Sequence, residues 1–336
     1  MTVRVSINGF GRIGRLILRA IYESGRKDLK VVTINNLASI EASAHLLKYD
    51  TVHGRFPFDV EVQGDKLIID GDEVLFTQQR DPSDLPLGDL DVDVAMECTG
   101  IFRDRAGAQK LLSAGAQKVL ISAPAKDEDI TVVYGVNDDK LTADHKIVSN
   151  ASCTTNCLAP VAYVLNETIG IDHGFMTTIH SYTGDQCLVD TAHSDLHRAR
   201  GGATNMIPTS TGAAKAVGLV LPELNGKLDG VSMRVPTPNV SVIDLNFVAK
   251  RGTSVAEINE AIQTAANGNK LKGILGCYKE PLVSSDFNHD ARSSIFALNE
   301  TRVMEGTFAR ILSWYDNEWG FSNRMADTAV KMASLK

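Results

Sequence analysis

A short segment near the middle of the chain carries two thiols among small and hydroxyl side chains. It reads NASCTTNC over residues 150–157 and contains Cys153 and Cys157. A zinc site normally takes four ligands in closely spaced pairs, and no second pair lies nearby in the sequence. The two cysteines also lack the C-x-x-C spacing of a redox pair. The segment therefore favours one reactive thiol with a neighbouring bystander.

Cys153 becomes a strong nucleophile if its surroundings stabilise the thiolate. The candidate base is His180 in the segment TTIHSYTGDQ, at the expected end of a strand. The residues at Cys153 read as a turn into a helix, whose amino end lowers the pKa of a thiol. Cys157 lies one turn further along and is expected to be buried. A single cysteine is most often a small buried hydrophobe and a single histidine is usually structural, so spacing alone leaves both interpretations open.

A glycine-rich motif lies at the start of the chain. Residues 9–14 read GFGRIG, directly after an alternating apolar segment and before residues with helical spacing. Between a strand and a helix, Gly9 allows a tight turn, Gly11 lets a pyrophosphate approach the backbone, and Gly14 allows close helix–strand packing. This context predicts dinucleotide binding, with a purely structural glycine turn as the alternative.

The dinucleotide fingerprint normally continues with an acidic residue about 20 positions further on, which bonds the ribose 2′-hydroxyl. Here the second strand is expected to end in Ile-Asn-Asn, with Asn36 at the place of the carboxylate. Asn36 can bond the hydroxyl but cannot repel a 2′-phosphate by charge. We therefore predict NAD as the cofactor and expect weak exclusion of NADP.

Two features of the second half could bind an anion. The segment TSTGAAKAVG, residues 209–218, is rich in hydroxyl groups and glycine and is expected to open a helix, which suits a phosphate. Arg234 is a cation on an otherwise apolar strand, where a buried charge needs a partner. A helix cap and a structural ion pair are the ordinary alternatives. Together with a dinucleotide fold and a reactive thiol, these features favour a phosphorylated substrate.

The elements that must position these residues follow from the apolar periodicity. Alternation at residues 3–7 and helical spacing from Arg12 predict a strand followed by a helix. Further buried strands are expected at LKVVTINN, VDVAMECTG and AQKVLISAP, with a helix at DRAGAQKLLSAG and a hairpin excursion between residues 51 and 91. Such alternation of strands and helices predicts a parallel, doubly wound sheet.

Beyond about residue 150 the pattern changes to long strands that look antiparallel. Examples are HGFMTTIHSYT, DGVSMRVPTPNVSVIDLNFVAK and GTFARILSWYDNE, with a helix at SVAEINEAIQTAAN that Ser254 would cap. We expect an α/β protein with an N-terminal Rossmann dinucleotide-binding domain, residues 1–152, completed by a C-terminal helix at 318–336. Residues 153–317 are expected to form an α+β catalytic domain with a mainly antiparallel sheet.

The chain has 336 residues, a net charge of -7 and five cysteines. The negative charge disfavours a general nucleic-acid binder, and an odd number of scattered cysteines does not suggest a disulfide framework. No apolar stretch approaches the roughly 20 residues of a transmembrane helix, and the N-terminus lacks the features of a signal peptide. We expect a cytoplasmic protein without membrane segments and without a metal site.

Six segments together resemble a known enzyme family. They are SINGFGRIGR, SNASCTTNCLAP, TTIHSYTGDQ, IPTSTGAAKAVG, RVPTPNVSVIDL and SWYDNEWGFSNRM, which follow the family's order and spacing between Val3 and Ala333. By this resemblance the chain is identified as a member of the phosphorylating glyceraldehyde-3-phosphate dehydrogenases. The resemblance implies a glycolytic and gluconeogenic oxidoreductase that converts D-glyceraldehyde 3-phosphate, phosphate and NAD to 1,3-bisphosphoglycerate and NADH.

The resemblance also implies roles for individual residues. Cys153 would be the catalytic nucleophile and His180 the base that activates it. The cofactor contacts would be Gly9, Gly11, Arg12, Ile13, Asn36, Arg80, Ser122 and Asn317. The substrate phosphate would bind at Thr183 and Arg234. Inorganic phosphate would bind at Ser152, Thr154, Thr211 and Gly212, with Arg200 bordering the anion sites.

The implied chemistry is covalent. The thiolate attacks the aldehyde to give a thiohemiacetal, loss of hydride gives a thioester, and inorganic phosphate splits the thioester. The family is usually a homotetramer, and residues 183–206 match the loop that lies against a neighbouring subunit's cofactor. No metal, membrane or general nucleic-acid partner is expected.

The chain departs from the family pattern at two places. Most NAD-using members carry Asp at the position of Asn36, and many carry Leu-Pro at the position of Thr191 and Ala192. Leu37 nevertheless follows the NAD-type pattern. We therefore predict NAD as the main cofactor with measurable use of NADP.

Two rival interpretations remain open to test. Erythrose-4-phosphate dehydrogenase, a relative that hydrolyses its thioester, usually departs from SYTGDQ and TSTGAAKAVG, and this chain keeps both segments. A binding module without chemistry is disfavoured by the joint presence of Cys153, His180, Thr183, Thr211 and Arg234. Dependence of turnover on inorganic phosphate separates the first rival from the expected enzyme.

Overall fold

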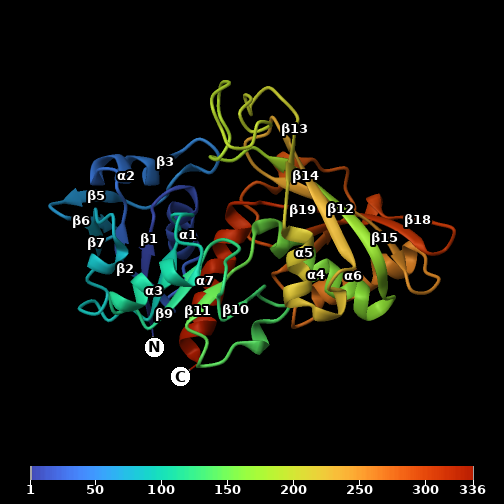
Figure 1. Ribbon diagram of the computed structural model, residues 1–336, viewed down its shortest axis with the longest axis horizontal. Coiled ribbons are helices and arrows are strands. Elements are labelled where there is room, and N and C mark those ends of the chain that lie inside the picture. Colours follow the sequence, from blue (N-terminus) through green and yellow to red (C-terminus); the bar gives the residue numbers. More distant parts are fainter. Residues whose placement is uncertain (1, 336) are drawn as a thin grey trace. The chain divides into compact units, whose positions relative to one another are not determined.

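The computed structural model describes residues 2–335, which divide into two compact units (Figure 1). The first unit comprises residues 2–134, 138–152 and 322–335, and the second comprises residues 135–137 and 153–321. Within the described residues, no helix combines the length and the apolar character that crossing a membrane requires. Short 3-10 helices occur at Pro82–Asp84, Asp138–Lys140, Pro222–Leu224, Ser284–Phe287 and Leu298–Glu300.

The first unit is built on a nine-stranded sheet with the order β10-β11-β9-β8-β1-β2-β7-β6-β5. Neighbouring strands from β10 to β7 pair in parallel, whereas β7, β6 and β5 form an antiparallel meander. The strands are β1 (Val3–Asn8), β2 (Leu29–Asn35), β5 (Val60–Gln63), β6 (Lys66–Ile69), β7 (Asp72–Thr77), β8 (Val94–Glu97), β9 (Lys118–Ile121), β10 (Ile130–Thr131) and β11 (Ile147–Ser149). Strands β3 (Tyr49–Asp50) and β4 (Gly54–Arg55) pair with each other.

The helices of this unit differ in how they begin. They are α1 (Arg12–Glu23), α2 (Ile40–Lys48), α3 (Arg105–Ser113) and, from Ser322 onward, α7 (Trp319–Ser334). The side chain of Ser39 caps α2 and that of Asp104 caps α3, each by accepting a first-turn N–H. The Lys118 ammonium on β9 donates to the carbonyls of Met332 and Leu335, at 2.8 and 3.0 Å, and so ties the end of the chain to the sheet.

The parallel, doubly wound sheet predicted from the sequence is confirmed, but the excursion between residues 51 and 91 differs from a simple hairpin. It contributes β5, β6 and β7 to the main sheet, and β7 pairs in parallel with β2. Alternation and Gly-Asp turns reveal local antiparallel pairing. They do not predict that β7 pairs with β2, which is distant in the sequence.

The second unit is built on an eight-stranded sheet with the order β13-β14-β12-β15-β19-β17-β16, in which β18 also pairs with β19. The strands are β12 (Ile171–Ser181), β13 (Ile207–Ser210), β14 (Leu228–Val235), β15 (Ser241–Ala249), β16 (Leu275–Tyr278), β17 (Ser294–Ala297), β18 (Arg302–Met304) and β19 (Phe308–Tyr315). The helices are α4 (Cys153–Thr168), α5 (Ala213–Val220) and α6 (Val255–Asn267). Ser254 caps α6 as predicted, by accepting the N–H of Glu257.

The sheet is mainly antiparallel, as predicted, with two exceptions: β12 pairs with β14 in parallel, and β16 pairs with β17 in parallel. The segment 228–249, which resembled continuous antiparallel structure, is two strands with β12 between them. Pro236 and Pro238 cannot donate to a strand ladder, and Val240 has a φ of +67°. The chain therefore leaves the sheet after β14 and returns on the other side of β12.

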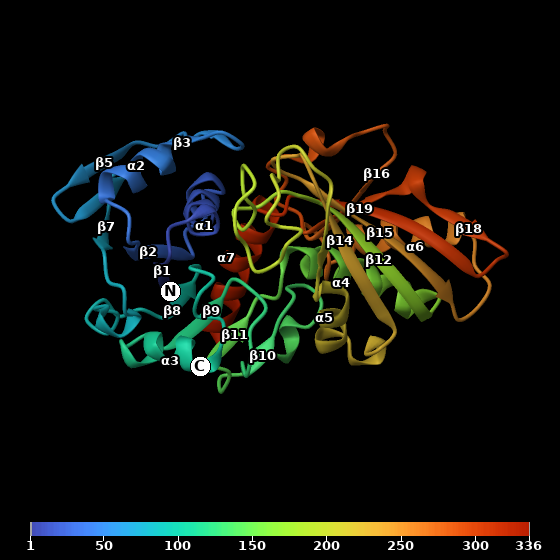
Figure 2. The same ribbon diagram turned by 45° about the horizontal axis from the view of Figure 1, so that its top comes forward.

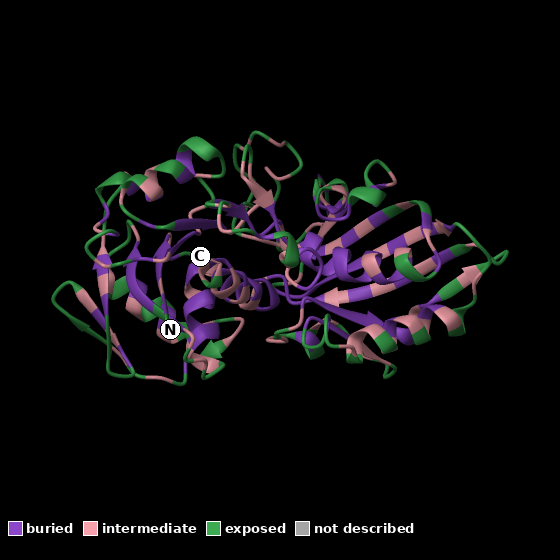
Figure 3. Ribbon diagram, turned by 90° about the horizontal axis from the view of Figure 1, so that it is seen from below, coloured by how far each residue is buried: buried purple, intermediate pink, exposed green. Residues whose placement is uncertain are grey.

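One face of this sheet is covered by helices. Helix α4 packs against β12, β15, β17 and β19, α5 against β14, and α6 against β16 (Figure 2). Burial alternates along the strands, visible as bands of purple and pink in Figure 3. Phe175 and Val231 lie on the opposite face and are exposed.

Candidate active site

Cys153 is the first residue of α4 and follows a strained turn. Ala151 is buried and has a φ of +56°, a left-handed conformation that residues with a Cβ atom rarely adopt. The amino end of α4 places the positive end of the helix dipole at Cys153. Burial raises the pKa of the Cys153 thiol, while the charge of Arg234 and hydrogen bonds from Thr154 oppose that rise.

His180 lies near the end of β12 with its ring against the thiol. Its Nε2 is 3.7 Å from Cys153 Sγ, and its Nδ1 donates to the Ser181 carbonyl at 2.7 Å. A carbonyl can only accept, so the bond to Ser181 requires the tautomer with its proton on Nδ1, and in that tautomer Nε2 faces the thiol as an acceptor. Burial and then the charge of Arg234 lower the pKa of His180 to about 3, which keeps the imidazole neutral near neutral pH.

Arg234 brings a positive charge to the same place because β14 pairs with β12 in parallel, with Arg234 opposite His180. Its Nη1 lies 3.0 Å from His180 Nδ1 and donates to the Ser181 carbonyl at 3.2 Å and to Thr183 Oγ1 at 3.1 Å. Among the residues that the structure describes, its buried Nε has no hydrogen-bond partner, and neither has the buried Thr209 Oγ1. A half-buried cation whose buried Nε has an unused donor suits an anionic ligand.

A buried tyrosine that the sequence analysis did not single out supports this cluster. Tyr315 Oη lies 2.8 Å from Thr154 Oγ1 and 2.9 Å from Thr178 Oγ1, and its ring meets His180 edge-on with centroids 5.9 Å apart. It thereby connects the start of α4 to the strand that carries His180. The alternation expected along SWYDNE places Tyr315 on the inward face of its strand, which is the signal that could have found it.

Asn317 follows β19, and two buried serines hold its side-chain oxygen. Ser181 Oγ and Ser241 Oγ each donate to Asn317 Oδ1 at 2.9 Å, and the Ser181 N–H donates to Ser241 Oγ at 3.0 Å. With Oδ1 occupied in this way, Asn317 offers its amide nitrogen to a ligand. Val240, next to Ser241, is β-branched and takes a left-handed conformation, strain that persists where neighbouring contacts over-determine the backbone. No local sequence pattern indicates either serine, because strand register brings the two together.

In the first unit, the glycine motif forms the turn between β1 and α1. Gly9 has a φ of +94°, and a Cβ atom there would come within 2.6 Å of the Thr99 nitrogen. A Cβ atom on Gly14 would lie 2.1 Å from the Gly9 carbonyl oxygen. Gly11 opens α1 without a side-chain cap, and the first turn contains no acidic residue. The turn therefore fits a pyrophosphate at the helix N-terminus.

A pocket of about 400 Å³ lies beside this turn, at the carboxyl ends of β1, β2 and β8. Two predicted cofactor contacts, Asn36 and Arg80, line it. The full lining is Asn8, Gly9, Gly11, Asn35, Asn36, Leu37, Gln79, Arg80, Cys98, Thr99, Ile101 and Phe102. Carboxyl ends of parallel strands are where open α/β sheets bind dinucleotides.

A buried polar chain connects the walls of this pocket. The Glu97 carboxyl accepts from Asn8 Nδ2 at 2.5 Å and from the Thr99 N–H at 2.7 Å, and Asn35 Nδ2 donates to Asn8 Oδ1 at 2.8 Å. Burial raises the pKa of Glu97 to about 7, against the opposing effect of the hydrogen bonds from Thr99 and Asn8. These hydrogen bonds connect the carboxyl ends of β1, β2 and β8.

The other predicted cofactor residues have structural partners of their own. The Arg12 guanidinium donates to Asp50 Oδ2 at 2.6 Å, which orients it at the start of α1. Ile13 is half-buried in the same turn. Ser122 follows β9, and its N–H donates to the Glu97 carbonyl at 3.0 Å.

The residues predicted to bind inorganic phosphate are not all brought together by contacts. Thr211 and Gly212 form the turn before α5, where Thr211 Oγ1 accepts the Ala213 N–H at 3.2 Å. Ser152 directly precedes Cys153 in the chain. Thr154 directly follows Cys153, but its hydroxyl group hydrogen-bonds with the hydroxyl group of Tyr315.

Arg200 and Thr183 differ in their surroundings. The structure pairs the exposed Arg200 with Asp190 Oδ2 at 2.6 Å rather than with the thiol cluster. Thr183, in contrast, contacts Arg234 and also donates its hydroxyl hydrogen to Asp185.

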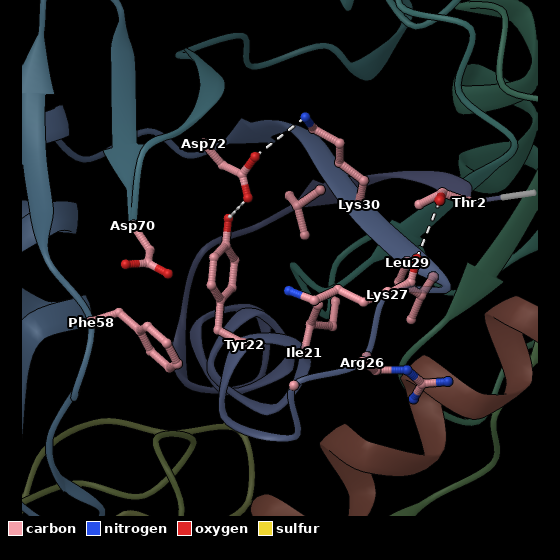
Figure 4. A pocket seen from close by; sticks show the side chains of 12 residues that line it. Thr2, Ile21, Tyr22, Arg26, Lys27, Leu29, Lys30, Phe58, Asp70 and Asp72 are labelled. Atoms are coloured by element: carbon pink, nitrogen blue, oxygen red, sulfur yellow. Dashed lines mark hydrogen bonds and ion pairs between the residues drawn. The ribbon is translucent and has the colours of Figure 1, made fainter.

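A second pocket of the first unit, of about 370 Å³, lies near the end of α1, the amino end of β2 and the turn before β7 (Figure 4). Figure 4 shows Asp72 between Tyr22 and Lys30, at 3.3 and 3.4 Å from their polar atoms. It contains none of the predicted site residues. Because it lies at the amino end of β2, it is not where the sheet binds dinucleotides.

Cys157 is the buried bystander that the sequence predicted. Its Sγ lies 3.5 Å from Ser294 Oγ, and burial raises its pKa to about 12. Over the part of the chain that the structure describes, no three His, Cys, Asp or Glu side chains form a group that could hold a metal ion.

Comparison with known proteins gives matches to both units. The model for the glyceraldehyde 3-phosphate dehydrogenase NAD binding domain matches residues 3–105, and that for the C-terminal domain matches residues 152–317. Glyceraldehyde-3-phosphate dehydrogenases of Xanthobacter flavus and Cereibacter sphaeroides are 65% and 63% identical over 335 residues, 100% of each chain. That of Geobacillus stearothermophilus is 53% identical over 99% of both chains. The chain belongs to the glyceraldehyde-3-phosphate dehydrogenase family.

Membership of the glyceraldehyde-3-phosphate dehydrogenase family makes the chain an NAD-dependent oxidoreductase. The resemblance that six segments indicated is confirmed, and so is NAD as the cofactor. The glycine turn and its pocket lie within the match to the NAD binding domain. The roles of individual residues stay predictions, which the contacts described above make testable.

Proposed function

We propose that the protein oxidises D-glyceraldehyde 3-phosphate in the presence of NAD and inorganic phosphate and releases 1,3-bisphosphoglycerate and NADH. The observation that carries this proposal is the pair of contacts that the buried His180 makes with Cys153 and Arg234. It combines a nucleophile, a base and a cation with an unused donor. Family membership supports the substrate class.

In the first step, Cys153 adds to the aldehyde carbon. The thiol proton passes to His180 Nε2, a C–S bond forms, and the aldehyde oxygen takes a proton to become the hydroxyl of a thiohemiacetal. The substrate phosphate would bind at Arg234 and Thr183. Its negative charge would offset the guanidinium that lowers the pKa of His180, so substrate binding would make His180 a stronger base.

The second step is the oxidation. NAD, when bound, supplies the acceptor for the hydride that leaves the carbon. His180 takes the proton of the thiohemiacetal hydroxyl, and the carbon–oxygen bond becomes the carbonyl of a thioester on Cys153. Asn317 would donate from its amide nitrogen to the carboxamide of the cofactor, because its oxygen is held by Ser181 and Ser241.

In the third step, inorganic phosphate resolves the thioester. A phosphate oxygen attacks the carbonyl carbon, the C–S bond breaks, and Cys153 leaves as a thiolate beside protonated His180. We place the attacking phosphate at Ser152, Thr154, Thr211 and Gly212, with Arg200 at the border. In support, the N-cap residue of α5, Gly212, has no side chain to occupy the N–H groups of the first turn. Thr211 Oγ1 accepts only the N–H of Ala213, so the N–H groups that follow suit a phosphate.

We further propose that NAD is the main cofactor and that NADP is used measurably. This rests on Asn36, which offers a neutral amide at the end of β2, and on Arg80, an exposed cation lining the same pocket. Neither residue repels a 2′-phosphate by negative charge.

We also propose a cytoplasmic homotetramer. All five cysteines are free, as expected in a reducing compartment. The loop of residues 183–206 exposes apolar side chains that suit burial against a neighbouring subunit. They are Leu188, Val189, Leu196 and Met206, with exposed fractions between 74% and 82%. Molecular mass in solution tests the assembly.

The reaction is tested by initial rates of NADH formation with glyceraldehyde 3-phosphate, with and without inorganic phosphate, and with NADP in parallel. We expect turnover to require phosphate. Sustained turnover without phosphate would assign the chain to the thioester-hydrolysing activity of an erythrose-4-phosphate dehydrogenase, and the present proposal would fail.

A further inference from the structure

The side-chain amide of Asn36 is held from one side by a buried serine. Asn36 is the first residue after β2, and its N–H donates to the Thr77 carbonyl at 3.0 Å, which fixes its backbone. Its Nδ2 donates to Ser43 Oγ at 3.1 Å. Ser43 lies on α2 and is 2% exposed. This bond uses one of the two amide hydrogens and directs Nδ2 toward Ser43, so Oδ1 points away from the serine and can accept from a ligand.

The direction of this amide matters because the two dinucleotides differ in what they present. The ribose 2′-hydroxyl of NAD can donate a hydrogen bond to Oδ1. The 2′-phosphate of NADP offers acceptor oxygens and negative charge, and it would meet the lone pairs of Oδ1. The same asparagine with its amide turned over would present Nδ2 and would favour the phosphate.

The charges around the pocket do not make this distinction. Arg80 lines it and is exposed, and no carboxylate belongs to the residues that line the pocket. A 2′-phosphate therefore meets attraction from Arg80 and no repulsion from a negative side chain. The orientation of the Asn36 amide is therefore the feature of this pocket that discriminates NAD from NADP.

Ser43 is suited to hold that orientation. Its own N–H donates to the Ser39 carbonyl at 3.0 Å, so it lies within the first turns of α2. The helix thereby fixes the position of its hydroxyl oxygen, which accepts the hydrogen bond from Asn36 Nδ2. Without the hydroxyl, both orientations of the amide would become accessible.

We propose that Ser43 is a specificity-determining residue, which favours NAD over NADP by holding the Asn36 amide with its oxygen available to the ribose 2′-hydroxyl. This inference rests on the proposed placement of the adenosine ribose at Asn36. It assigns a role to a residue that does not line the pocket. Ser43 acts through Asn36 and is in this sense a positioning residue.

The test compares the dissociation constants of NAD and NADP, measured by calorimetric titration of the full-length protein. Replacement Ser43→Ala should raise NADP affinity relative to NAD affinity by roughly fivefold, the usual effect of one hydrogen bond. Replacement Ser43→Thr keeps the hydroxyl and should restore the wild-type ratio. The matched control is Ser39→Ala, which removes the cap of the same helix without touching Asn36 and should leave the ratio unchanged.

A double variant separates the amide from any general effect on α2. In an Asn36→Ala background there is no amide to hold, so adding Ser43→Ala should leave the ratio unchanged. The inference would be overturned if Ser43→Ala changed the ratio of NADP to NAD affinity equally in the wild-type and Asn36→Ala backgrounds. It would also be overturned if Ser43→Ala did not change the ratio in the wild-type background. If Ser43→Ala does not fold, Ser43→Cys, which weakens the acceptor at similar volume, takes its place with the same expected direction. Binding requires neither aldehyde nor phosphate, so failure of the proposed reaction would leave this test interpretable.

Discussion

The two binding regions of this chain are built from different materials. In the first unit, the dinucleotide pocket is lined by backbone turned at Gly9, neutral amide side chains and the exposed Arg80. The buried carboxyl of Glu97 does not line the pocket but accepts a hydrogen bond from Asn8, which does. In the second unit, the region around Cys153 gathers the buried His180 with Arg234 in direct contact. The first selects a ligand by shape and hydrogen-bond direction, whereas the second shifts pKa values and so prepares groups for chemistry.

This contrast predicts that each region can be damaged while the other keeps its own property. For the second region the property is thiol reactivity and turnover. For the first it is cofactor affinity, which can be measured without any aldehyde.

The largest effect is expected for Cys153→Ser. Loss of the thiol removes the nucleophile, so kcat should fall by roughly a thousandfold or more. The affinity for NAD should stay within about twofold of the wild type, since the Gly9 turn is unchanged. Steady-state rates and NAD titration check the two parts. Cys157→Ser is the matched control. Turnover that survives in Cys153→Ser but not in Cys157→Ser would show that Cys157 is the nucleophile and would contradict the role proposed for Cys153.

The next effect is expected for Arg234→Gln. Arg234 lowers the pKa of Cys153, so its removal should raise that pKa and reduce the thiolate fraction at a given pH. The rate of alkylation by iodoacetamide should then rise at a higher pH than in the wild type. Loss of the phosphate partner should also reduce kcat/KM for glyceraldehyde 3-phosphate by about a hundredfold.

Arg310→Gln provides a control for that substitution. Arg310 lies on the same sheet but pairs with Asp244 and Glu300, so its removal should leave the alkylation profile in place. Identical alkylation profiles for Arg234→Gln and the wild type would contradict the electrostatic role assigned to Arg234.

The first region should respond most strongly to Gly9→Ala. The left-handed backbone and the close approach to Thr99 leave no room for a methyl group, so NAD affinity should fall by about tenfold or more. The alkylation rate of Cys153 should not change. Gly64→Ala introduces the same left-handed strain with no atom within 4 Å of the new methyl group, and should leave NAD affinity intact. Equal losses in both variants would trace the effect to backbone strain alone.

A smaller effect is expected for Ser241→Ala, which probes a hydrogen-bond direction in the second unit. Asn317 loses one of the two hydroxyl groups that hold Oδ1, so KM for NAD should rise by roughly fivefold with little change in thiol alkylation. Thr301→Val removes a comparable buried bond, from Thr301 to Asn259 Oδ1 at 2.7 Å, at a distance from this site. An equal rise in KM for Thr301→Val would reduce the Ser241 effect to general destabilisation.

The smallest effect concerns the pH dependence of folding through Glu97. Burial raises the pKa of Glu97 to about 7, so the folded state holds this proton more tightly than the unfolded chain. Its stabilising contribution is present at low pH and is lost as the pH rises through about 7. Between mildly acidic and neutral buffer, the unfolding temperature of Glu97→Gln should therefore fall by about 2–4 °C less than that of the wild type. If the unfolding temperatures of the two proteins changed equally with pH, Glu97 would not titrate in this range.

The sequence predicted those parts of the fold and site whose determinants are local. The turn at Gly9, the helix that follows it and the position of Cys153 at the start of α4 are set by neighbours within a few residues. The parallel pairing of β14 with β12, which places Arg234 opposite His180, depends on a partner 54 residues away. Ser241 was missed for the same reason, since register brings it to the site, whereas the alternation along SWYDNE could have indicated that Tyr315 faces inward.

The central claim is that the oxidised substrate stays covalently bound to Cys153 until phosphate releases it. The most direct measurement is the intact mass of the protein after mixing with glyceraldehyde 3-phosphate and NAD in the absence of inorganic phosphate. Our account predicts one acyl group per chain, mapped to Cys153 by peptide analysis and lost when phosphate is added. An unmodified chain that nevertheless produces NADH, or an acyl group on another residue, would contradict it.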